Sequence, residues 1–266
     1  MAKRIEGRIR ILSALHHGGD EKTGSTPMLR AVTILRDGRR VRVPYISGNA
    51  IRGVIRRLLV RDMIELCGIQ ELPKKAVHIL ASGGVLELGE STGRIDLDMK
   101  TRLRDTIPLI RLLGCSIGNQ IISGQLIVGH AVPIAQETVG VLMPELQGDF
   151  LPVRELIGQE FITRRDEVRE RDEDDQAVQM KVDFEVLLPG TVLWHYFQVN
   201  DRDAMAVATI GRAIKLWREK PFIGARSASG FGEIDPQYQE IPDDAPYVEH
   251  MTTSAEAIKE LIKEIA

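Results

Sequence analysis

Residues 41–66 constrain the fold most, because their pattern changes from that of a strand to that of a helix across a turn of small residues. Apolar and polar residues alternate in the first five positions, as in a half-buried strand. Ser47 and Asn49 follow, and both are favourable helix caps. Apolar residues then recur at helical spacing, and Gly68 is expected to end the helix.

The beginning of this helix has the chemistry of an anion site. Arg52, Arg56 and Arg57 are predicted to lie on or beside its solvent-facing side. The turn before them is expected to leave N–H groups free at the positive end of the helix dipole. Guanidinium and N–H groups together suit a phosphate backbone. Any surface helix of an α/β protein also carries arginine on its wet side, so both interpretations stay open on this stretch alone.

Composition narrows the class of protein. The 266 residues and the hydrophobic content of 43% fit one large domain with a sizeable core. No apolar run approaches a membrane span, and the first residues lack a signal segment, which predicts a cytoplasmic protein. Cys67 and Cys115 lie in apolar surroundings, so we expect buried thiols in a reducing compartment rather than metal ligands.

Charge is distributed unevenly along the chain. The net charge is −3, yet the first sixty residues carry roughly +9 and the chain from Asp235 onward is acidic. This polarity indicates a polyanion on one side and water or a basic partner on the other. An ordinary ion-paired surface is the alternative.

The patterning predicts two amphipathic helices, each between strands. Strands are expected over residues 4–15, 27–35, 39–45, 121–135, 177–188 and 192–199. Asp37 and Gly38 form a hairpin signal, and Asp201 is expected to cap a second helix over residues 203–219. A short peripheral helix is expected over 258–265. A split βαβ, ferredoxin-like core is the simplest architecture.

A second motif, residues 223–234, is a glycine-rich loop that leads into a short strand. Its glycines and small residues allow another backbone to approach closely, and Arg226 adds a cation. It is not a Walker loop, because no Gly-Lys-Ser/Thr ends it. It is not a dinucleotide fingerprint either, because it follows a helix and leads into a strand.

Together, the two motifs resemble the CRISPR-associated RAMP superfamily. Residues 44–56 are similar to that family's strand, small-residue turn and Arg-Gly helix, and residues 224–232 resemble its C-terminal glycine-rich loop. Residues 111–114, Arg-Leu-Leu-Gly, are similar to a short element before its central hairpin. The order agrees from Ile5 to Ile234. Within the superfamily the chain most resembles backbone subunits of type III and type IV effector complexes.

The resemblance implies one α+β domain, residues 1–266, with a ferredoxin-like (RRM-like) palm. The palm core is expected over about residues 4–66, 121–135 and 178–234. A helical or flap insertion is expected over 69–119, a thumb-like insertion over 136–180 and an acidic extension over 235–266. The projecting thumb hairpin itself is placed at Phe161 to Met180.

The resemblance also implies a subunit that grips the phosphate backbone of a guide crRNA, and a departure from the family pattern, described below, predicts that this subunit is non-catalytic. Its partners would be the crRNA, a complementary DNA or RNA target, copies of itself in a helical filament and other effector subunits, with no cofactor, metal or membrane. The predicted RNA-binding residues are His16, His17, Arg30, Ser47, Gly48, Asn49, Arg52, Arg56, Arg57, Arg164, Arg165, Gly224, Arg226, Ser227, Ser229, Gly230 and Phe231.

One departure from the family pattern concerns catalysis. Type III backbone subunits cut target RNA with an aspartate just before a Pro-x-x-Arg stretch, and here Ser25 stands before residues 27–30. A hydroxyl cannot act as a carboxylate base or bind a divalent ion strongly. Asp20 or Asp37 is the possible substitute. The alternatives are a metal-dependent target-RNA endonuclease subunit, a guide-processing nuclease that uses a histidine such as His16, and a structural module unrelated to CRISPR.

Overall fold

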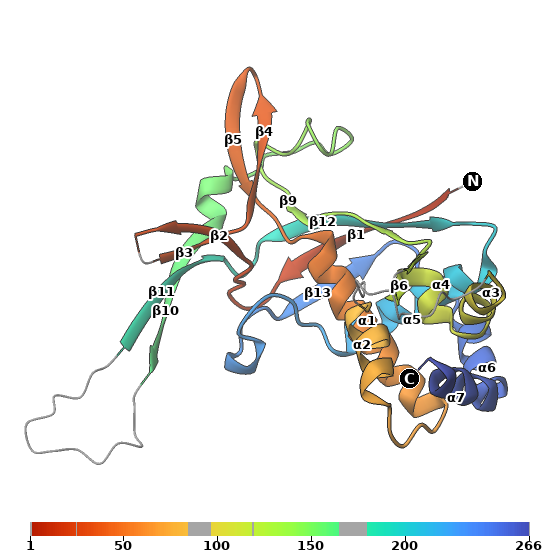
Figure 1. Ribbon diagram of the computed structural model, residues 1–266. Coiled ribbons are helices and arrows are strands. Elements are labelled where there is room, and N and C mark those ends of the chain that lie inside the picture. Colours follow the sequence, from red (N-terminus) through yellow and green to blue (C-terminus); the bar gives the residue numbers. More distant parts are fainter. Residues whose placement is uncertain (1, 25, 85–96, 119, 165–179, 266) are drawn as a thin grey trace, which may run out of the picture.

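A five-stranded antiparallel sheet forms the centre of this mixed α+β protein (Figure 1). The computed structural model describes residues 2–24, 26–84, 97–118, 120–164 and 180–265. The sheet strands are β1 (Ala2–Ile11), β8 (Ile127–Val128), β9 (Val132–Pro133), β12 (Val192–Asn200) and β13 (Ile234–Tyr238). Their order is β13-β1-β12-β8, and β9 also pairs with β12.

One face of this sheet is apolar, and two helices cover it. The register places Ile5 opposite Phe197 and Ile9 opposite Leu193, so the buried side chains of β1 and β12 share a face. Helices α1 (Gly48–Leu66) and α5 (Ala204–Glu219) lie on that side and contribute to the same hydrophobic core (Figure 1). Fully buried Trp217 is among its largest side chains. This burial of apolar area is the main force that holds helices and sheet together.

The ends of the two helices follow capping rules. The Ser47 hydroxyl accepts a hydrogen bond from the Ala50 N–H, and Gly68, with φ of 61°, follows the end of α1, as predicted. For α5, the predicted cap Asp201 is wrong. The carboxylate of Asp203 accepts the Ala206 N–H, because Asp203 directly precedes the first helical residue.

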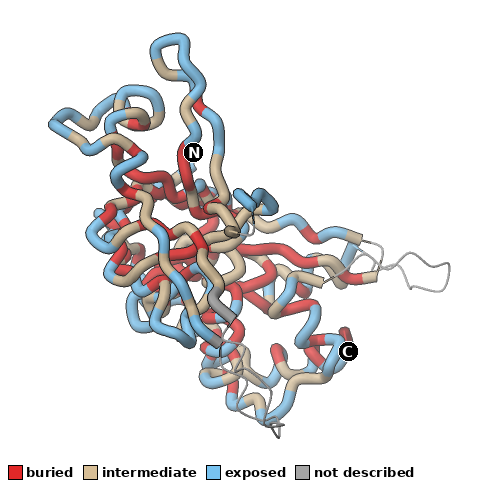
Figure 2. The backbone as a smooth tube through the Cα atoms, turned by 90° about the vertical axis from the view of Figure 1, so that its left-hand side faces the viewer, coloured by how far each residue is buried: buried red, intermediate tan, exposed pale blue. Residues whose placement is uncertain are grey.

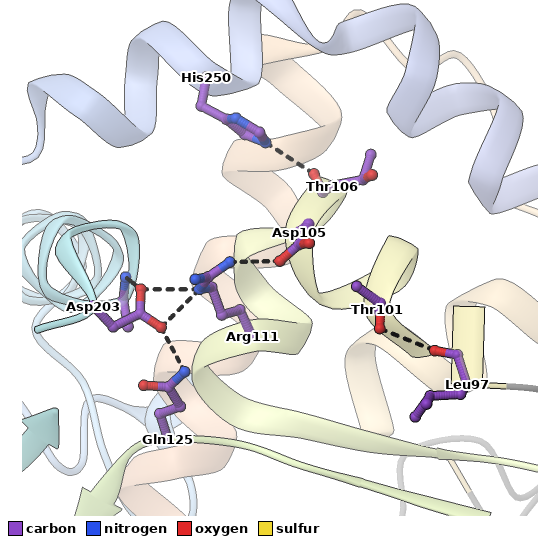
Figure 3. Close-up of polar contacts among 9 residues, drawn as sticks. Leu97, Thr101, Asp105, Thr106, Arg111, Gln125, Asp203 and His250 are labelled. Atoms are coloured by element: carbon purple, nitrogen blue, oxygen red, sulfur yellow. Dashed lines mark hydrogen bonds and ion pairs between the residues drawn. The ribbon is translucent and has the colours of Figure 1, made fainter. Parts of the chain in front are cut away.

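The predicted insertion between α1 and the central strands is largely helical in its described part. Its elements are α2 (Lys74–Ser82), α3 (Leu97–Thr106), α4 (Pro108–Leu113), β6 (Gly114–Ile117) and β7 (Gln120–Ser123). Arg111 of α4 forms a 2.7 Å ion pair with Asp203 and a 2.8 Å ion pair with Asp105 (Figure 3). The insertion is thereby joined to the beginning of α5. The expected strand over 121–135 is divided into β7, β8 and β9.

The C-terminal segment forms two helices, α6 (Ala245–Thr253) and α7 (Ala255–Glu264). The helix predicted over 258–265 is present as part of α7, but the expectation that it is peripheral is wrong, because Ile258 and Ile262 are buried in the main core. The imidazole Nε2 of His250 lies 3.0 Å from the Thr106 carbonyl of α3, a further tie to the insertion (Figure 3). The two cysteines are buried free thiols, as predicted.

Three hairpins extend from the sheet and helices (Figure 1). They are β2 (Gly18–Thr23) with β3 (Thr26–Leu29), β4 (Ala31–Arg36) with β5 (Arg39–Pro44), and β10 (Ile157–Arg164) with β11 (Met180–Leu187). The β4–β5 turn has φ of 50° at Asp37 and 74° at Gly38, which confirms the predicted turn. The expected strand over 27–35 is divided at Arg30, whose main chain bonds to His17 and Tyr45 instead.

Two short 3-10 turns, η1 (Val153–Leu156) and η2 (Ser227–Ser229), complete the described elements. Most of the segment predicted as the thumb tip, residues 165–179, lies outside the described residues. No helix in the described ranges combines the length and apolar character needed to cross a membrane.

Candidate nucleic-acid interface

The start of α1 and the glycine-rich loop lie on either side of the segment that follows β1. The Ala225 N–H donates to the His16 carbonyl at 2.9 Å, and the Gly232 N–H donates to the Ala14 carbonyl at 3.0 Å. On the other side, the Ser47 N–H donates to the His17 imidazole. Neighbouring residues of one short segment thus hold the two sequence motifs in one place.

Two imidazoles cap the first N–H groups of α1. The Ser47 N–H donates to Nε2 of His17 at 3.2 Å, and the Gly48 N–H donates to Nδ1 of His130 at 3.0 Å. A ring nitrogen that accepts a hydrogen bond carries no proton. Burial, followed by the charges of Arg30 and His16, lowers the pKa of His17 to about 4. The prediction that these N–H groups are free is therefore wrong.

The two histidines after β1 are not a solvated loop. His16 is buried, and its Nδ1 lies 2.6 Å from the Glu185 carbonyl of β11, to which it can donate. His17 is half-buried between Arg30 and the start of α1. Both side chains therefore hold neighbouring segments in place, His16 from within the protein and His17 from a partly exposed position.

The arginines of α1 differ in their surroundings. Arg56 is only 6% exposed, and burial lowers the pKa of its guanidinium to about 10. It donates hydrogen bonds to three main-chain oxygens, those of Leu80, Leu113 and Gly114. Arg52 is half-buried; it donates to the Leu126 carbonyl and shares the Leu113 carbonyl with Arg56. The prediction of a solvent-facing position holds for Arg57 and is wrong for Arg56, because α1 packs against the insertion on that side.

Glycine is required at two positions of the glycine-rich loop. A Cβ at Gly224 would lie 2.7 Å from the His16 carbonyl oxygen, and one at Gly232 would lie 1.9 Å from a main-chain oxygen of Ile223. Their φ angles are +92° and +77°. The expected close approach of another backbone is present: the partner of Gly224 is the segment after β1, and that of Gly232 is Ile223 at the beginning of the loop itself.

The loop is anchored on β11 through aromatic contacts. The Arg226 guanidinium lies 4.1 Å from the centre of the buried Phe184 ring, and the Phe231 ring packs edge-on against the same ring at 5.5 Å. Ser227, Ser229 and Gly230 are exposed at the tip. Arg226 and Phe231 therefore position the loop, and the small residues form its free surface.

A groove of about 220 Å³ separates α1 from this loop, and we call it the α1–loop groove. It is lined by Val54, Arg57, Leu58, Arg61, Lys220, Phe222, Ile223, Gly224 and Ser227. Its three cationic residues are exposed, and none of them forms an ion pair with any residue that the structure describes. The groove can therefore accept an anion without first breaking an internal pair.

Sequence reasoning missed two of these cations. Arg61 lies four positions after Arg57, so helical periodicity alone places both on one face. Lys220 has no comparable signal, because only the fold brings the end of α5 to α1.

The remaining predicted contacts are dispersed. Asn49 is exposed on the first turn of α1, whereas Ser47 and Gly48 are buried. Arg30 is half-buried beside Gly18, and Arg164 lies at the far end of β10 from the groove. Arg165 and Ser25 lie outside the described residues. Within the described ranges, no three His, Cys, Asp or Glu side chains gather closely enough to hold a metal ion.

The chain is therefore an α+β protein with an exposed cationic groove, the α1–loop groove, between a helix and a glycine-rich loop. The chain belongs to the RAMP superfamily, which it matches over residues 8–235. The predicted family is thereby confirmed. No curated protein matches the chain. A solved structure titled "Type IV-B CRISPR Complex" is similar, with a TM-score of 0.65 and 20% identity, covering 89% of this chain and 90% of that one.

Proposed function

We propose that this chain is a subunit of a CRISPR effector complex that binds the phosphate backbone of a guide RNA in the α1–loop groove. The observation that carries the proposal is the set of three unpaired cations, Arg57, Arg61 and Lys220, between the two motifs of the family. The similar complex of type IV-B favours a type IV assignment over type III.

The chemistry of the groove suits a sequence-independent grip. Cations neutralise phosphates, while the Ser227 hydroxyl can donate to a phosphate oxygen. Asn49, Ser229 and Gly230 are also exposed, on the two motifs that flank the groove. Aromatic residues make up only 5% of the chain, so base stacking contributes little. Guide pairing, rather than this protein, would read the target sequence.

The topology supports the remaining expectations. Strands β1 and β8 both run antiparallel to β12, which lies between them, and α1 and α5 connect strands of one sheet. We take this arrangement as the ferredoxin-like palm, and the β10–β11 hairpin as the thumb. In the proposal, copies of this palm line up along one crRNA in the cytoplasm, beside other subunits, and present it to a DNA or RNA target.

We further propose that the subunit does not cut RNA. Ser25 replaces the carboxylate that the resemblance leads us to expect. Of the possible substitutes, Asp37 lies at the turn of the β4–β5 hairpin and Asp20 is exposed on β2. A histidine nuclease is disfavoured, because both His16 and His17 are engaged in structural hydrogen bonds. Incubation of the loaded complex with matched RNA and magnesium should leave the RNA intact.

Charge reversal in the groove tests the binding role. Arg57→Glu and Arg61→Glu should each weaken RNA binding about tenfold, and together roughly a hundredfold. The slope of log affinity against log salt concentration should become shallower by about 0.7 for each phosphate that the variant no longer neutralises. Arg202→Glu is the matched control, because Arg202 is exposed in the turn before α5. A double variant with the affinity and salt slope of the wild type would refute the assignment.

A further inference from the structure

A second pocket lies on the face of the central sheet that α1 and α5 do not cover. Its floor is formed by β1 and β13, because Arg8 and Gln237 lie opposite each other on the side away from buried Ile5 and Ile9. The segment between β9 and η1 passes above this face, with α1 and α5 below the sheet (Figure 1). Much of that segment is exposed or half-buried, as Figure 2 shows for the parts of the chain that project from the buried centre. This pocket and the α1–loop groove are therefore on opposite sides of the sheet.

The pocket has the size of a small-ligand site and an aromatic wall. Its volume is about 380 Å³, and such sites usually measure about 300–1,000 Å³. Half-buried Trp194 lines it and packs, with Leu146, against the smaller hydrophobic cluster of the protein. The Tyr196 ring lies 5.4 Å from the Trp194 ring, and the Arg4 guanidinium lies 3.9 Å from the centre of the Tyr196 ring. These contacts hold the indole, so a planar ligand can stack on a fixed ring.

The charges that line the pocket are mixed, which argues against a phosphate as its ligand. Arg8 and Glu145 are exposed, and neither forms an ion pair with any residue that the structure describes. The third charged group, Glu6, pairs with Arg4 at 2.8 Å. A phosphate drawn to Arg8 would also meet the carboxylate of Glu145. One free cation and one free carboxylate instead suit a neutral ligand that offers both acceptors and donors.

Arg8 is placed to reach a ligand that stacks on Trp194. In the sheet register, Arg8 lies directly opposite Trp194 of β12 on one side and opposite Gln237 of β13 on the other. Side chains directly opposite each other on neighbouring strands have Cβ atoms about 4.5–5.5 Å apart. The ring and the guanidinium can therefore contact one planar ligand together.

We propose that this pocket binds an unpaired guanine base. Guanidinium N–H groups can donate to O6 and N7 of guanine, which is the commonest specific pairing of arginine with a base. The carboxylate of Glu145 can accept from the N1–H and the 2-amino group on the other edge. Adenine presents an amino group in place of O6 and has no N1–H. A free guanosine nucleotide and a guanine in single-stranded RNA both carry this chemistry.

Tryptophan fluorescence tests the inference directly, since the chain has two tryptophans and the other, Trp217, is fully buried. Guanosine and GMP should quench the emission of Trp194 to saturation with similar affinity, because the pocket holds the base rather than the phosphate. Adenosine should bind about tenfold more weakly or worse. Inosine, which lacks the 2-amino group, should bind with intermediate affinity.

Variants of the two charged groups test their roles. Arg8→Gln and Glu145→Gln should each weaken guanosine binding about tenfold, and they should keep the fold because both side chains are exposed. Glu145→Gln should also narrow the difference between guanosine and inosine, since the carboxylate that contacts the 2-amino group is then absent. The matched control is Arg10→Gln, which should bind like the wild type, because Arg10 is exposed on the same strand outside the pocket.

A comparison of GMP with a single-stranded oligouridine that carries one guanine identifies the source of the base. A strand that binds at least about tenfold more tightly than GMP assigns the base to RNA, and equal affinity assigns it to a free nucleotide. The Arg57→Glu/Arg61→Glu variant should keep its guanosine affinity, because the α1–loop groove lies on the other side of the sheet. Failure of either site therefore leaves the other one standing.

Four outcomes would overturn the inference. Three of them are the absence of quenching by any nucleoside, equal affinity for guanosine and adenosine, and a Glu145→Gln variant that binds guanosine like the wild type. The fourth is an emission that changes with protein concentration and not with nucleosides, since a second copy of the protein would then fill the pocket.

Discussion

Arg56 and Arg57 are neighbours on α1, and substitution of each to alanine should separate stability from RNA binding. The Arg56 guanidinium donates to the carbonyls of Leu80, Leu113 and Gly114 at 2.8 to 3.2 Å. The first two carbonyls lie in the last turns of α2 and α4, where helices leave acceptors unsatisfied. One buried cation therefore completes the ends of two helices.

The expected cost of Arg56→Ala follows from these contacts. Hydrogen bonds to a charged group contribute about 1.5–3 kcal/mol each, but water can re-enter and partly replace them. Removal of one member of a buried charged network typically costs about 3–5 kcal/mol. For a chain of this size each kcal/mol lowers Tm by roughly 2–4 °C, so we expect a fall of about 6–20 °C. Arg57→Ala should change the unfolding free energy by no more than about 0.5 kcal/mol.

Urea unfolding, followed by circular dichroism, measures the first effect, and RNA titration measures the second. Arg56→Ala should unfold at lower urea with an unchanged m value, whereas Arg57→Ala should unfold like the wild type and bind RNA more weakly. Arg56→Lys should recover part of the stability, because one ammonium cannot reach all three oxygens. If Arg56→Ala stays within about 1 kcal/mol of the wild type and loses RNA affinity, the structural role is refuted.

Three further predictions concern buried or strained groups. Burial lowers the pKa of His195 from 6.5 to about 3, so between these values the unfolded chain binds more protons than the folded one. The unfolding free energy should therefore fall by about 1.4 kcal/mol for each pH unit below 6.5. Urea titrations at several pH values between 6.5 and 3 measure this fall, and its absence would contradict the burial argument. Gly232→Ala places a Cβ 1.9 Å from a main-chain oxygen, so it should weaken RNA binding and lower stability. The control is Gly190→Ala, which is also at positive φ but in open space. It should lower stability modestly and leave RNA binding unchanged. Asp203→Ala removes the cap of α5 and the partner of Arg111, and should cost about 2–4 kcal/mol in thermal or urea unfolding; a loss within about 0.5 kcal/mol would contradict its dual role.

Much of the local structure could be predicted from the sequence. The beginning and end of α1, the Ser47 cap and the Asp37 turn follow from backbone rules that act over a few residues. The glycine-rich loop could be recognised for the same reason, since positive φ and the absence of a Cβ are local requirements. These features also carried the family resemblance, which the comparison confirms.

The predictions that failed depended on partners far away in the chain. Arg56 occupies a helical position that a surface residue could equally take, and only the packing of α2 and α4 makes it buried. His17 and His130 cap α1 from separate loops, which no local pattern indicates. Likewise, Asp201 and Asp203 are both plausible caps in sequence, and the exact first turn of α5 selected the second.

The sequence by itself determined where chain direction changes, which faces are apolar and which family the chain resembles, because these depend on short-range sterics and periodicity. Only the tertiary structure decided which cationic side chains remain exposed and unpaired, and so can bind an anion. A guanidinium is equally charged whether it faces water or carbonyls, and its surroundings come from segments distant in the chain. That is why Arg52 and Arg56 are internal ties, while Arg57, Arg61 and Lys220 are left to face an anion.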